Sequence, residues 1–124
     1  MVSGIGVDIM EIDRIRRSLD SSGERLLTRL FTEGEIAYCI SKSNKYQHLA
    51  ARFAAKEALG KALATGIGGS FGWKDIEIIN DTRGRPEFRL HGSLETRLKS
   101  ASLFLSLSHS ESHVVAMVIV EEKR

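Results

Sequence analysis

One long helix-forming stretch constrains the fold of this chain more than any other feature of the sequence. Residues 49–65 read LAARFAAKEALGKALAT, are rich in Ala, Leu and Lys, and contain no proline and no β-branched residue before Thr65. Glycine-rich sequence follows from Gly66, as is common where a helix ends. The sequence therefore predicts one helix that begins near Lys45. Its apolar side, which is expected to face the core, consists of Ala55, Leu59, Ala62 and Leu63.

The charged residues of this predicted helix lie on neighbouring sides. Side chains four residues apart share a side, which gives two rows: Phe53, Glu57 and Lys61, and beside them Arg52, Lys56 and Gly60. One interpretation is a solvated face, since a Glu–Lys pair at this spacing stabilises a helix by about 0.2–0.5 kcal/mol. Phe53 in the row and Gly60 within the helix favour the other interpretation, a face that something approaches closely.

Length and composition indicate one globular domain over residues 1–124. Hydrophobic residues make up 42% and charged residues 27% of the chain, which is ordinary for a soluble protein. The net charge of +2 is too small to argue for nucleic acid as a partner. No apolar run reaches the roughly 20 residues that span a membrane, and no signal-peptide pattern is present. The single cysteine, Cys39, fits a reducing, cytoplasmic setting.

A carboxylate interrupts the first predicted strand. Residues 2–10, VSGIGVDIM, have the apolar and β-branched character of a strand, with Asp8 among apolar neighbours. A carboxylate inside a buried strand is costly unless it is paired or binds a metal. Two interpretations stay open: Asp8 caps the helix that follows, with Glu11 placed as in a capping box, or Asp8 binds a cation.

The order of the remaining elements predicts an α+β fold. Thr32 and Glu35 form a capping-box pattern, Gly84 lies at a predicted hairpin turn, and Ser93 is expected to cap the last helix. Strands are expected at 2–10, 75–79, 85–90, 103–108 and 113–121, and helices at 11–19, 23–31, 33–41, 49–65 and 93–101. We therefore expect a mainly antiparallel sheet, which the first strand joins, packed against a long central helix and shorter helices.

Four residues from three predicted elements make a chemically coherent set: Asp8, Glu57, Lys61 and His109. Two carboxylates that met could hold Mg²⁺, which binds one or two carboxylates together with water and phosphate. A lysine one turn from Glu57 could reach a phosphate oxygen, which favours phosphoryl-type chemistry. Zinc is disfavoured because there is one cysteine and no paired-ligand spacing. A metal-dependent nuclease or phosphatase, and a non-enzymatic module with a basic face, stay open at this point.

Four segments of the sequence resemble those of a known family. They are GIGVDIMEIDRI at 4–15, RFAAKEALGKAL at 52–63, ATGIGG at 64–69 and SLSHS at 106–110. In this order and spacing they resemble the signature segments of the holo-acyl-carrier-protein synthases, the small bacterial phosphopantetheinyl transferases. The resemblance extends from about residue 2 to the final strand.

The resemblance implies transfer of phosphopantetheine from coenzyme A to a serine of apo acyl carrier protein, with release of adenosine 3',5'-bisphosphate, in fatty acid biosynthesis. It also implies a homotrimer with active sites between subunits. The implied residues are Asp8 and Glu57 for Mg²⁺; Glu57, Lys61 and His109 for catalysis; Arg52, Lys56, Lys61, Gly66 and His109 for coenzyme A; and Arg14 and Arg17 for docking of the acidic carrier. The proton acceptor, Glu57 or a metal-bound water, stays open.

Two features of the sequence bear on the implied docking and assembly. Arg14 and Arg17 lie on the outer side of a predicted helix, either as a solvated face or as a patch for an acidic partner. Residues 114–120 are nearly all apolar, so both faces of this strand should be buried. We expect a neighbouring subunit to cover what one chain leaves open.

Overall fold

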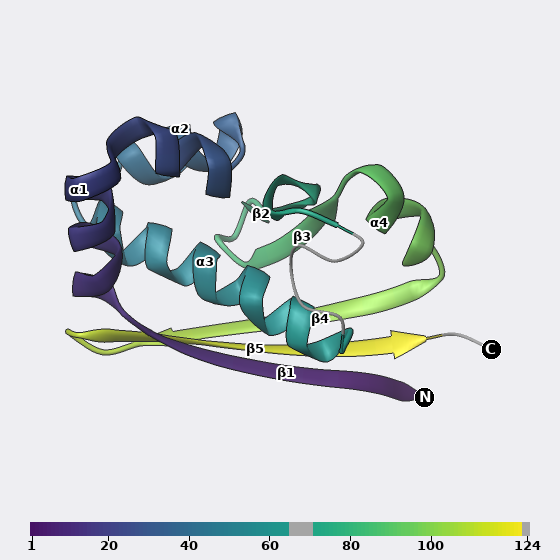
Figure 1. Cartoon of the computed structure of the whole chain (residues 1–124). Helices are drawn as coiled ribbons and strands as arrows, with labels where there is room; N and C mark the ends of the chain where they lie inside the picture. The colour runs from purple at the N-terminus through teal and green to yellow at the C-terminus, as the bar shows by residue number, and fades with distance from the viewer. Residues whose placement is uncertain (65–70, 123–124) are drawn as a thin grey trace.

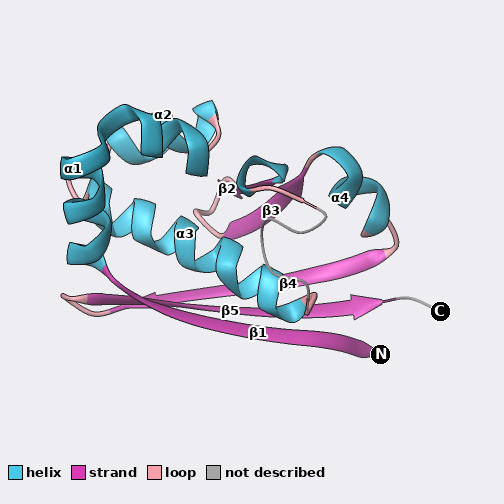
Figure 2. Ribbon diagram, in the orientation of Figure 1, coloured by secondary structure: helices cyan, strands magenta, loops and turns pink. Residues whose placement is uncertain are grey.

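The computed structural model describes residues 1–64 and 71–122, and helix α3 lies at its centre (Figure 1). The elements are, in chain order, β1 Val2–Glu11, α1 Ile12–Leu30, α2 Glu33–Ile40, α3 Lys45–Ala62, the short 3₁₀ helix η1 Trp73–Asp75, β2 Ile76–Asn80, β3 Pro86–Leu90, α4 Gly92–Arg97, β4 Ala101–His109 and β5 His113–Glu122. A three-stranded antiparallel sheet, in the order β1-β5-β4, lies on one side of α3, and α2 and the β2-β3 hairpin lie on the other (Figure 2). The α+β class with a long central helix is confirmed, but the described strands form two sheets rather than one.

Two glycines of β1 let α3 lie directly on the three-stranded sheet. A Cβ atom on Gly6 would stand 1.9 Å from the backbone oxygen of Ala58, and one on Gly4 would stand 2.0 Å from that of Ala62. Side-chain carbons do not approach other atoms this closely, so both positions require glycine. Because alternate residues of a strand share a face, Asp8 points to the same side of β1 as these glycines.

Helix α3 is buried over most of its length. It runs from Lys45 to Ala62, close to the predicted span, and its buried residues include Gly60. The backbone of Ala64 then adopts a left-handed conformation with φ 60°, so this alanine takes the place where a glycine was expected. Residues 65–70, with the predicted Gly66 contact and most of the glycine-rich loop, lie outside the described residues.

Of the two interpretations of Asp8, the helix-capping one is wrong. Asp8 lies inside β1, opposite Ala116 of β5. The N-cap of α1 is Glu11, whose side chain makes no capping hydrogen bond. Helix α1 has a non-helical residue at Gly23, with φ 59°, so it consists of two helical segments joined by a kink, close to the two short helices that were expected.

The C-terminal half contains the two predicted hairpins. The β2-β3 hairpin has Gly84 in the left-handed conformation, with φ 84°, as expected. The last helix differs from the prediction: α4 begins at Gly92, and its N-cap is His91 rather than Ser93. The backbone N–H of His91 donates to the backbone oxygen of Asp75 at 2.8 Å, and Gly92 has a φ of 64°, a conformation that favours glycine. Strand β5 pairs with both β4 and β1, so it is the central strand.

One face of the three-stranded sheet is buried and the other is open. Alternate residues of β5 are buried on the side of α3; they are Val114, Ala116, Val118 and Val120. The opposite side, called the outer face below, exposes large apolar side chains to between 42% and 65%; they are Ile5, Val7, Ile9, Phe104 and Met117. The single chain therefore buries one of the two faces that were expected to be buried. Within the described residues, no helix is both long and apolar enough to cross a membrane.

Candidate active site

The packing of α3 on β1 brings Asp8 and Lys61 together. The Lys61 ammonium donates to Asp8 Oδ1 at 3.1 Å and to the backbone oxygen of Val7 at 3.0 Å. The Asp8 side chain is 17% exposed, whereas that of Lys61 is 55% exposed. Lys61 thus pairs with a carboxylate that the fold partly buries, while its own ammonium stays accessible to a ligand.

Glu57 lies beside the same pair, one turn before Lys61 on α3. Partial burial raises the pKa of Glu57, the negative charge of Asp8 raises this pKa further, and the positive charges of Lys61 and Arg14 oppose the change. A carboxylate whose charge is disfavoured by a second carboxylate is stabilised by a shared cation. The structure therefore gathers three predicted site residues into one group, called the carboxylate cluster below: Asp8, Glu57 and Lys61.

The donor set of the carboxylate cluster fits Mg²⁺ better than zinc. Over residues 1–64 and 71–122 there is no group of three or more His, Cys, Asp or Glu side chains that could hold a metal. Mg²⁺ commonly binds one or two carboxylates and completes its octahedron with water and substrate phosphate. Zinc sites take three or four protein ligands. Two carboxylates beside an accessible lysine therefore suit a magnesium ion that is shared with a phosphate.

Arg14 and Arg17 both lie exposed on α1, but their surroundings differ. Arg14 is close enough to Glu57 to oppose the rise in the pKa of that carboxyl. Arg17 lies 3.6 Å from Asp13 on its own helix. Arg14 therefore stands at the edge of the carboxylate cluster, and Arg17 stands farther along the surface of α1.

Arg52 is buried without a carboxylate partner in the part of the chain that the structure describes. Arg52 is 3% exposed, and its guanidinium donates a hydrogen bond to Asn80 Oδ1 at 2.7 Å. The guanidinium carbon lies 4.4 Å from the centroid of the Tyr38 ring. Its Nε has no hydrogen-bond partner among the described residues. Since a buried charge without a partner is costly, this arrangement suits the binding of an anion.

His48 lies near both Arg52 and His109. Burial lowers the pKa of His48, and the positive charges of Arg52, Lys42 and His109 lower it further. We call these four side chains the basic cluster. No hydrogen bond or ion pair within the described residues joins His109 to the carboxylate cluster, so the predicted site residues fall into two groups. Sequence reasoning missed His48, although its place four residues before Arg52, on the same side of α3, was an available signal.

Lys56 lies in the interior rather than at a binding surface. Its ammonium donates to Glu35 Oε1 at 2.7 Å, to the backbone oxygen of Leu30 at 2.8 Å and to that of Trp73 at 3.0 Å. Burial lowers the pKa of this fully buried lysine, and the charge of Glu35 opposes that shift. A lysine has three hydrogens to donate, and all three are used inside the chain. This placement does not fit the expectation that Lys56 lines a coenzyme A site.

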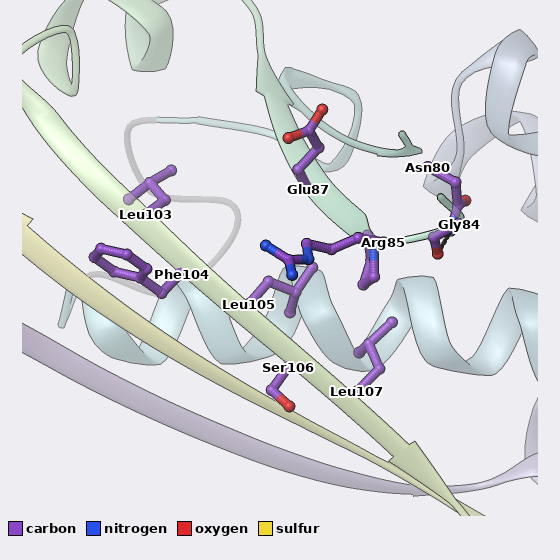
Figure 3. Close-up of a pocket in the computed structure, with 10 residues that line it drawn as sticks. Asn80, Gly84, Arg85, Glu87, Leu103, Phe104, Leu105, Ser106 and Leu107 are labelled. Carbon is purple, nitrogen blue, oxygen red and sulfur yellow. Dashed lines mark hydrogen bonds between the residues drawn. The ribbon is translucent and has the colours of Figure 1, made fainter. Parts of the chain in front are cut away.

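A cavity of about 600 Å³ lies between the turn of the β2-β3 hairpin and β4 (Figure 3). Figure 3 shows the Arg85 side chain extending from the hairpin toward Leu105 of β4. The walls are formed by Asn80, Gly84, Arg85, Pro86, Glu87 and residues 103–107. Because Asn80 also accepts the hydrogen bond from Arg52, the cavity adjoins the basic cluster. The sequence did not predict this cavity. Strands β3 and β4 belong to different sheets and do not pair, so neither strand carries a hydrophobic pattern that would indicate their proximity.

Comparison with known proteins agrees with the family resemblance seen in the sequence. The family model described as the 4'-phosphopantetheinyl transferase superfamily matches residues 4–118. The holo-[acyl-carrier-protein] synthase of Chlamydia trachomatis serovar D is 51% identical over 118 residues, which cover 95% of this chain and 98% of that protein. The holo-[acyl-carrier-protein] synthase of a Geobacter species is 47% identical over an alignment that covers 98% of this chain and 99% of that protein.

Solved structures show the same fold. The holo-[acyl-carrier-protein] synthase of Neisseria meningitidis superposes with a TM-score of 0.91 at 37% identity, over 98% of this chain and 100% of that one. The enzyme of Helicobacter pylori, solved in complex with coenzyme A, has a TM-score of 0.85 at 32% identity, over 94% of this chain and 99% of that one. The chain belongs to the 4'-phosphopantetheinyl transferase superfamily and, within it, to the holo-[acyl-carrier-protein] synthases.

Proposed function

We propose that this chain, with Mg²⁺ held by Asp8 and Glu57, transfers phosphopantetheine from coenzyme A to a serine of apo acyl carrier protein. The observation that carries the proposal is the convergence of two carboxylates and an accessible lysine from β1 and α3. The products are holo acyl carrier protein, which serves fatty acid biosynthesis, and adenosine 3',5'-bisphosphate. A bond forms between the serine oxygen and the phosphorus of the phosphopantetheine, and the bond from that phosphorus to the departing nucleotide breaks.

The residues of the carboxylate cluster have separate tasks in this reaction. Transfer of this kind depends on charge neutralisation and in-line positioning more than on covalent catalysis. Lys61, whose ammonium is accessible, neutralises the phosphate under attack and holds Asp8 in place. Magnesium, when bound, supplies charge neutralisation at the pyrophosphate and makes the nucleotide a better leaving group. The nucleophile is the serine of the carrier, so the chain needs none of its own.

The basic cluster is proposed to bind the phosphates of coenzyme A. Arg52 supports this role because its buried guanidinium has an Nε that no described residue satisfies. His109, at the end of β4, supports it because it lies near His48, which in turn lies near Arg52. The complex of the Helicobacter pylori relative with coenzyme A supports the choice of ligand.

Arg14 and Arg17 are proposed to dock the acidic carrier protein. Both side chains are exposed on α1, where an acidic surface can reach them. The place of Arg14 beside Glu57 supports a docking surface that delivers the carrier serine close to the carboxylate cluster. Arg17 is the cleaner probe of docking, because a change there does not touch the electrostatics of Glu57.

The outer face is proposed to be the contact of a homotrimer. Ile5, Val7 and Ile9 of β1 expose 59%, 55% and 65% of their surface, beside Met117 of β5 and Phe104 of β4. An apolar surface of this kind on a folded chain commonly marks a protein interface. The number three comes from the family resemblance, and the trimer places the active sites between subunits. A cytoplasmic location, in keeping with one buried cysteine, and a single domain over residues 1–124 complete the proposal.

One experiment separates this function from its rivals. The protein is incubated with apo acyl carrier protein, coenzyme A and Mg²⁺, and the carrier is weighed by mass spectrometry. We expect the carrier to gain the mass of one phosphopantetheine, with adenosine 3',5'-bisphosphate released in equal amount. An unmodified carrier beside intact coenzyme A would make the chain a binding module, and hydrolysed coenzyme A beside an unmodified carrier would make it a phosphatase or nuclease.

A further inference from the structure

A buried ion pair at the centre of the molecule has no part in the function proposed above. Glu35 of α2 is 1% exposed and Lys56 of α3 is fully buried. The Lys56 ammonium lies 2.7 Å from Glu35 Oε1. Neither residue belongs to the carboxylate cluster or to the basic cluster.

Lys56 ties α3 to two other segments besides α2. Its ammonium donates to the backbone oxygen of Leu30, the last residue of α1, and to that of Trp73 in η1. The Trp73 ring also stacks on Phe53 of α3, with centroids 4.9 Å apart. One lysine therefore fixes α3 against the end of α1, α2 and η1 at a single point.

Glu35 extends the connection to β2. Its Oε1 accepts the Thr32 N–H at 3.0 Å, which together with the Thr32 side chain confirms the predicted capping box. Its Oε2 accepts the Ile78 N–H of β2 at 3.0 Å. The carboxylate thus accepts three hydrogen bonds and the ammonium donates three, so both charged groups of the buried pair are fully satisfied.

The position of this pair on α3 relates it to the chemistry. Lys56 precedes Glu57 directly, and successive residues of a helix stand about 100° apart around the axis. The ion pair therefore holds one side of α3 while Glu57 and Lys61 face Asp8 on β1. We propose that Glu35 and Lys56 are positioning residues, which fix the rotation of α3 and so hold Glu57 and Lys61 against Asp8. This inference rests on the transferase function proposed above.

Physical chemistry explains why directional bonds are needed at this place. Two apolar side chains of similar size often stabilise a protein as well as a buried ion pair does. Apolar contacts, however, tolerate sliding and rotation, whereas five hydrogen bonds of defined direction, one of them shared by Lys56 and Glu35, do not. The pair therefore matters for the register between α3 and its neighbours, and this register decides whether the three groups of the carboxylate cluster meet.

The test replaces Lys56 by methionine, whose unbranched side chain is one atom shorter and lacks the three donors. Lys56→Met should lower kcat for carrier modification by about tenfold or more, because reacting groups misplaced by about 1 Å lose rate steeply. The KM values for coenzyme A and for the carrier should stay within about twofold of those of the unchanged protein. Lys74→Met is the matched control: it makes the same change at an exposed lysine of η1 and should leave kcat unaltered.

Each outcome decides the inference. A folded Lys56→Met protein with unchanged kcat would overturn it, and an increased KM for coenzyme A with unchanged kcat would return Lys56 to the ligand site. If the single variant does not fold, the double variant Glu35→Gln with Lys56→Met removes both charges together and should fold but turn over slowly. If neither variant folds, the ion pair is required for folding itself, and the inference that it positions α3 for catalysis would be overturned. An inactive unchanged protein would refute the proposed transferase function instead.

Discussion

Replacing Gly6 by alanine tests whether the separation of β1 and α3 controls activity. A Cβ atom at this position would stand 1.9 Å from the Ala58 oxygen and 2.8 Å from the Ala62 nitrogen. Both are backbone atoms of α3, which cannot rotate out of the way as a side chain can. Ordinary contact begins at 3.4 Å, so the strand and helix must separate by the difference from 1.9 Å, about 1.5 Å.

Such a separation acts directly on the carboxylate cluster, because Asp8 belongs to the strand and Glu57 and Lys61 belong to the helix. A displacement of about 1 Å at reacting groups can lower a rate about 100-fold. We therefore expect kcat/KM for carrier modification to fall by about 100-fold in Gly6→Ala. The same overpacking should lower the free energy of unfolding by about 1–3 kcal/mol.

The assay measures initial rates of carrier modification by mass spectrometry, and urea unfolding on the same preparation. Gly72→Ala is the matched control, because a Cβ atom there meets no atom of the described residues within 4 Å and the backbone φ of −112° suits alanine. That control should keep both activity and stability. A Gly6→Ala protein that matches the control in kcat/KM would refute the link between this spacing and catalysis.

Asp8→Asn keeps the side-chain size but removes its charge, so turnover should fall by about 10²–10³-fold and the requirement for Mg²⁺ should rise. Initial rates against Mg²⁺ concentration check this, and near-normal turnover at low Mg²⁺ would remove Asp8 from the metal site. Arg17→Glu should raise the KM for the carrier while that for coenzyme A stays within about twofold, and added salt should act similarly on the unchanged protein. An equal rise in both KM values would contradict docking at α1. Met117→Asp, on the outer face, should give a folded monomer of low activity by light scattering and circular dichroism. An intact trimer would show that subunits meet elsewhere. Burial raises the pKa of Glu77, but the hydrogen bonds with His91 and Thr32 and the charges of His91 and Arg89 together outweigh burial, so this pKa lies below its usual value. Ionised Glu77 therefore stabilises the fold above the usual glutamate pKa, about 4.3, and the stabilisation is lost as pH falls through the lowered pKa. His91→Ala should move acid unfolding, followed by circular dichroism, to higher pH, and an unmoved midpoint would count against this pair.

The sequence made part of the carboxylate cluster predictable because helical spacing encodes which side chains share a side. Glu57 and Lys61 stand four apart, and both take part in the cluster. Asp8 was predictable for another reason, since a carboxylate within an apolar strand has to find a partner, and it finds Lys61 at 3.1 Å. The metal interpretation of Asp8 stays a prediction, whereas its capping interpretation is wrong.

Lys56 shows what spacing cannot supply. Lys56 is adjacent to Glu57 in the sequence. The row of α3 that contains Lys56 and the row that contains Glu57 both carry charged residues, so the sequence of the helix alone does not indicate which row faces the interior. The answer depends on Glu35, 21 residues earlier, whose carboxylate is buried and pairs with this lysine. The N-cap of α4 was missed as well: Ser93 has the better capping chemistry, but the N-cap is His91, whose backbone N–H donates to the distant Asp75.

The pairing of β1 with β5 ties the active site to the completion of the chain. The two strands pair from Val2 opposite Glu121 to Glu11 opposite His113. Asp8 therefore stands in a strand whose hydrogen-bonding partner emerges from the ribosome far later than β1 itself. Closing so long a loop is entropically costly and slows folding. A chain that stops before residue 113, whether truncated or still being synthesised, lacks the strand that pairs with β1. We therefore expect such a chain to modify no carrier protein.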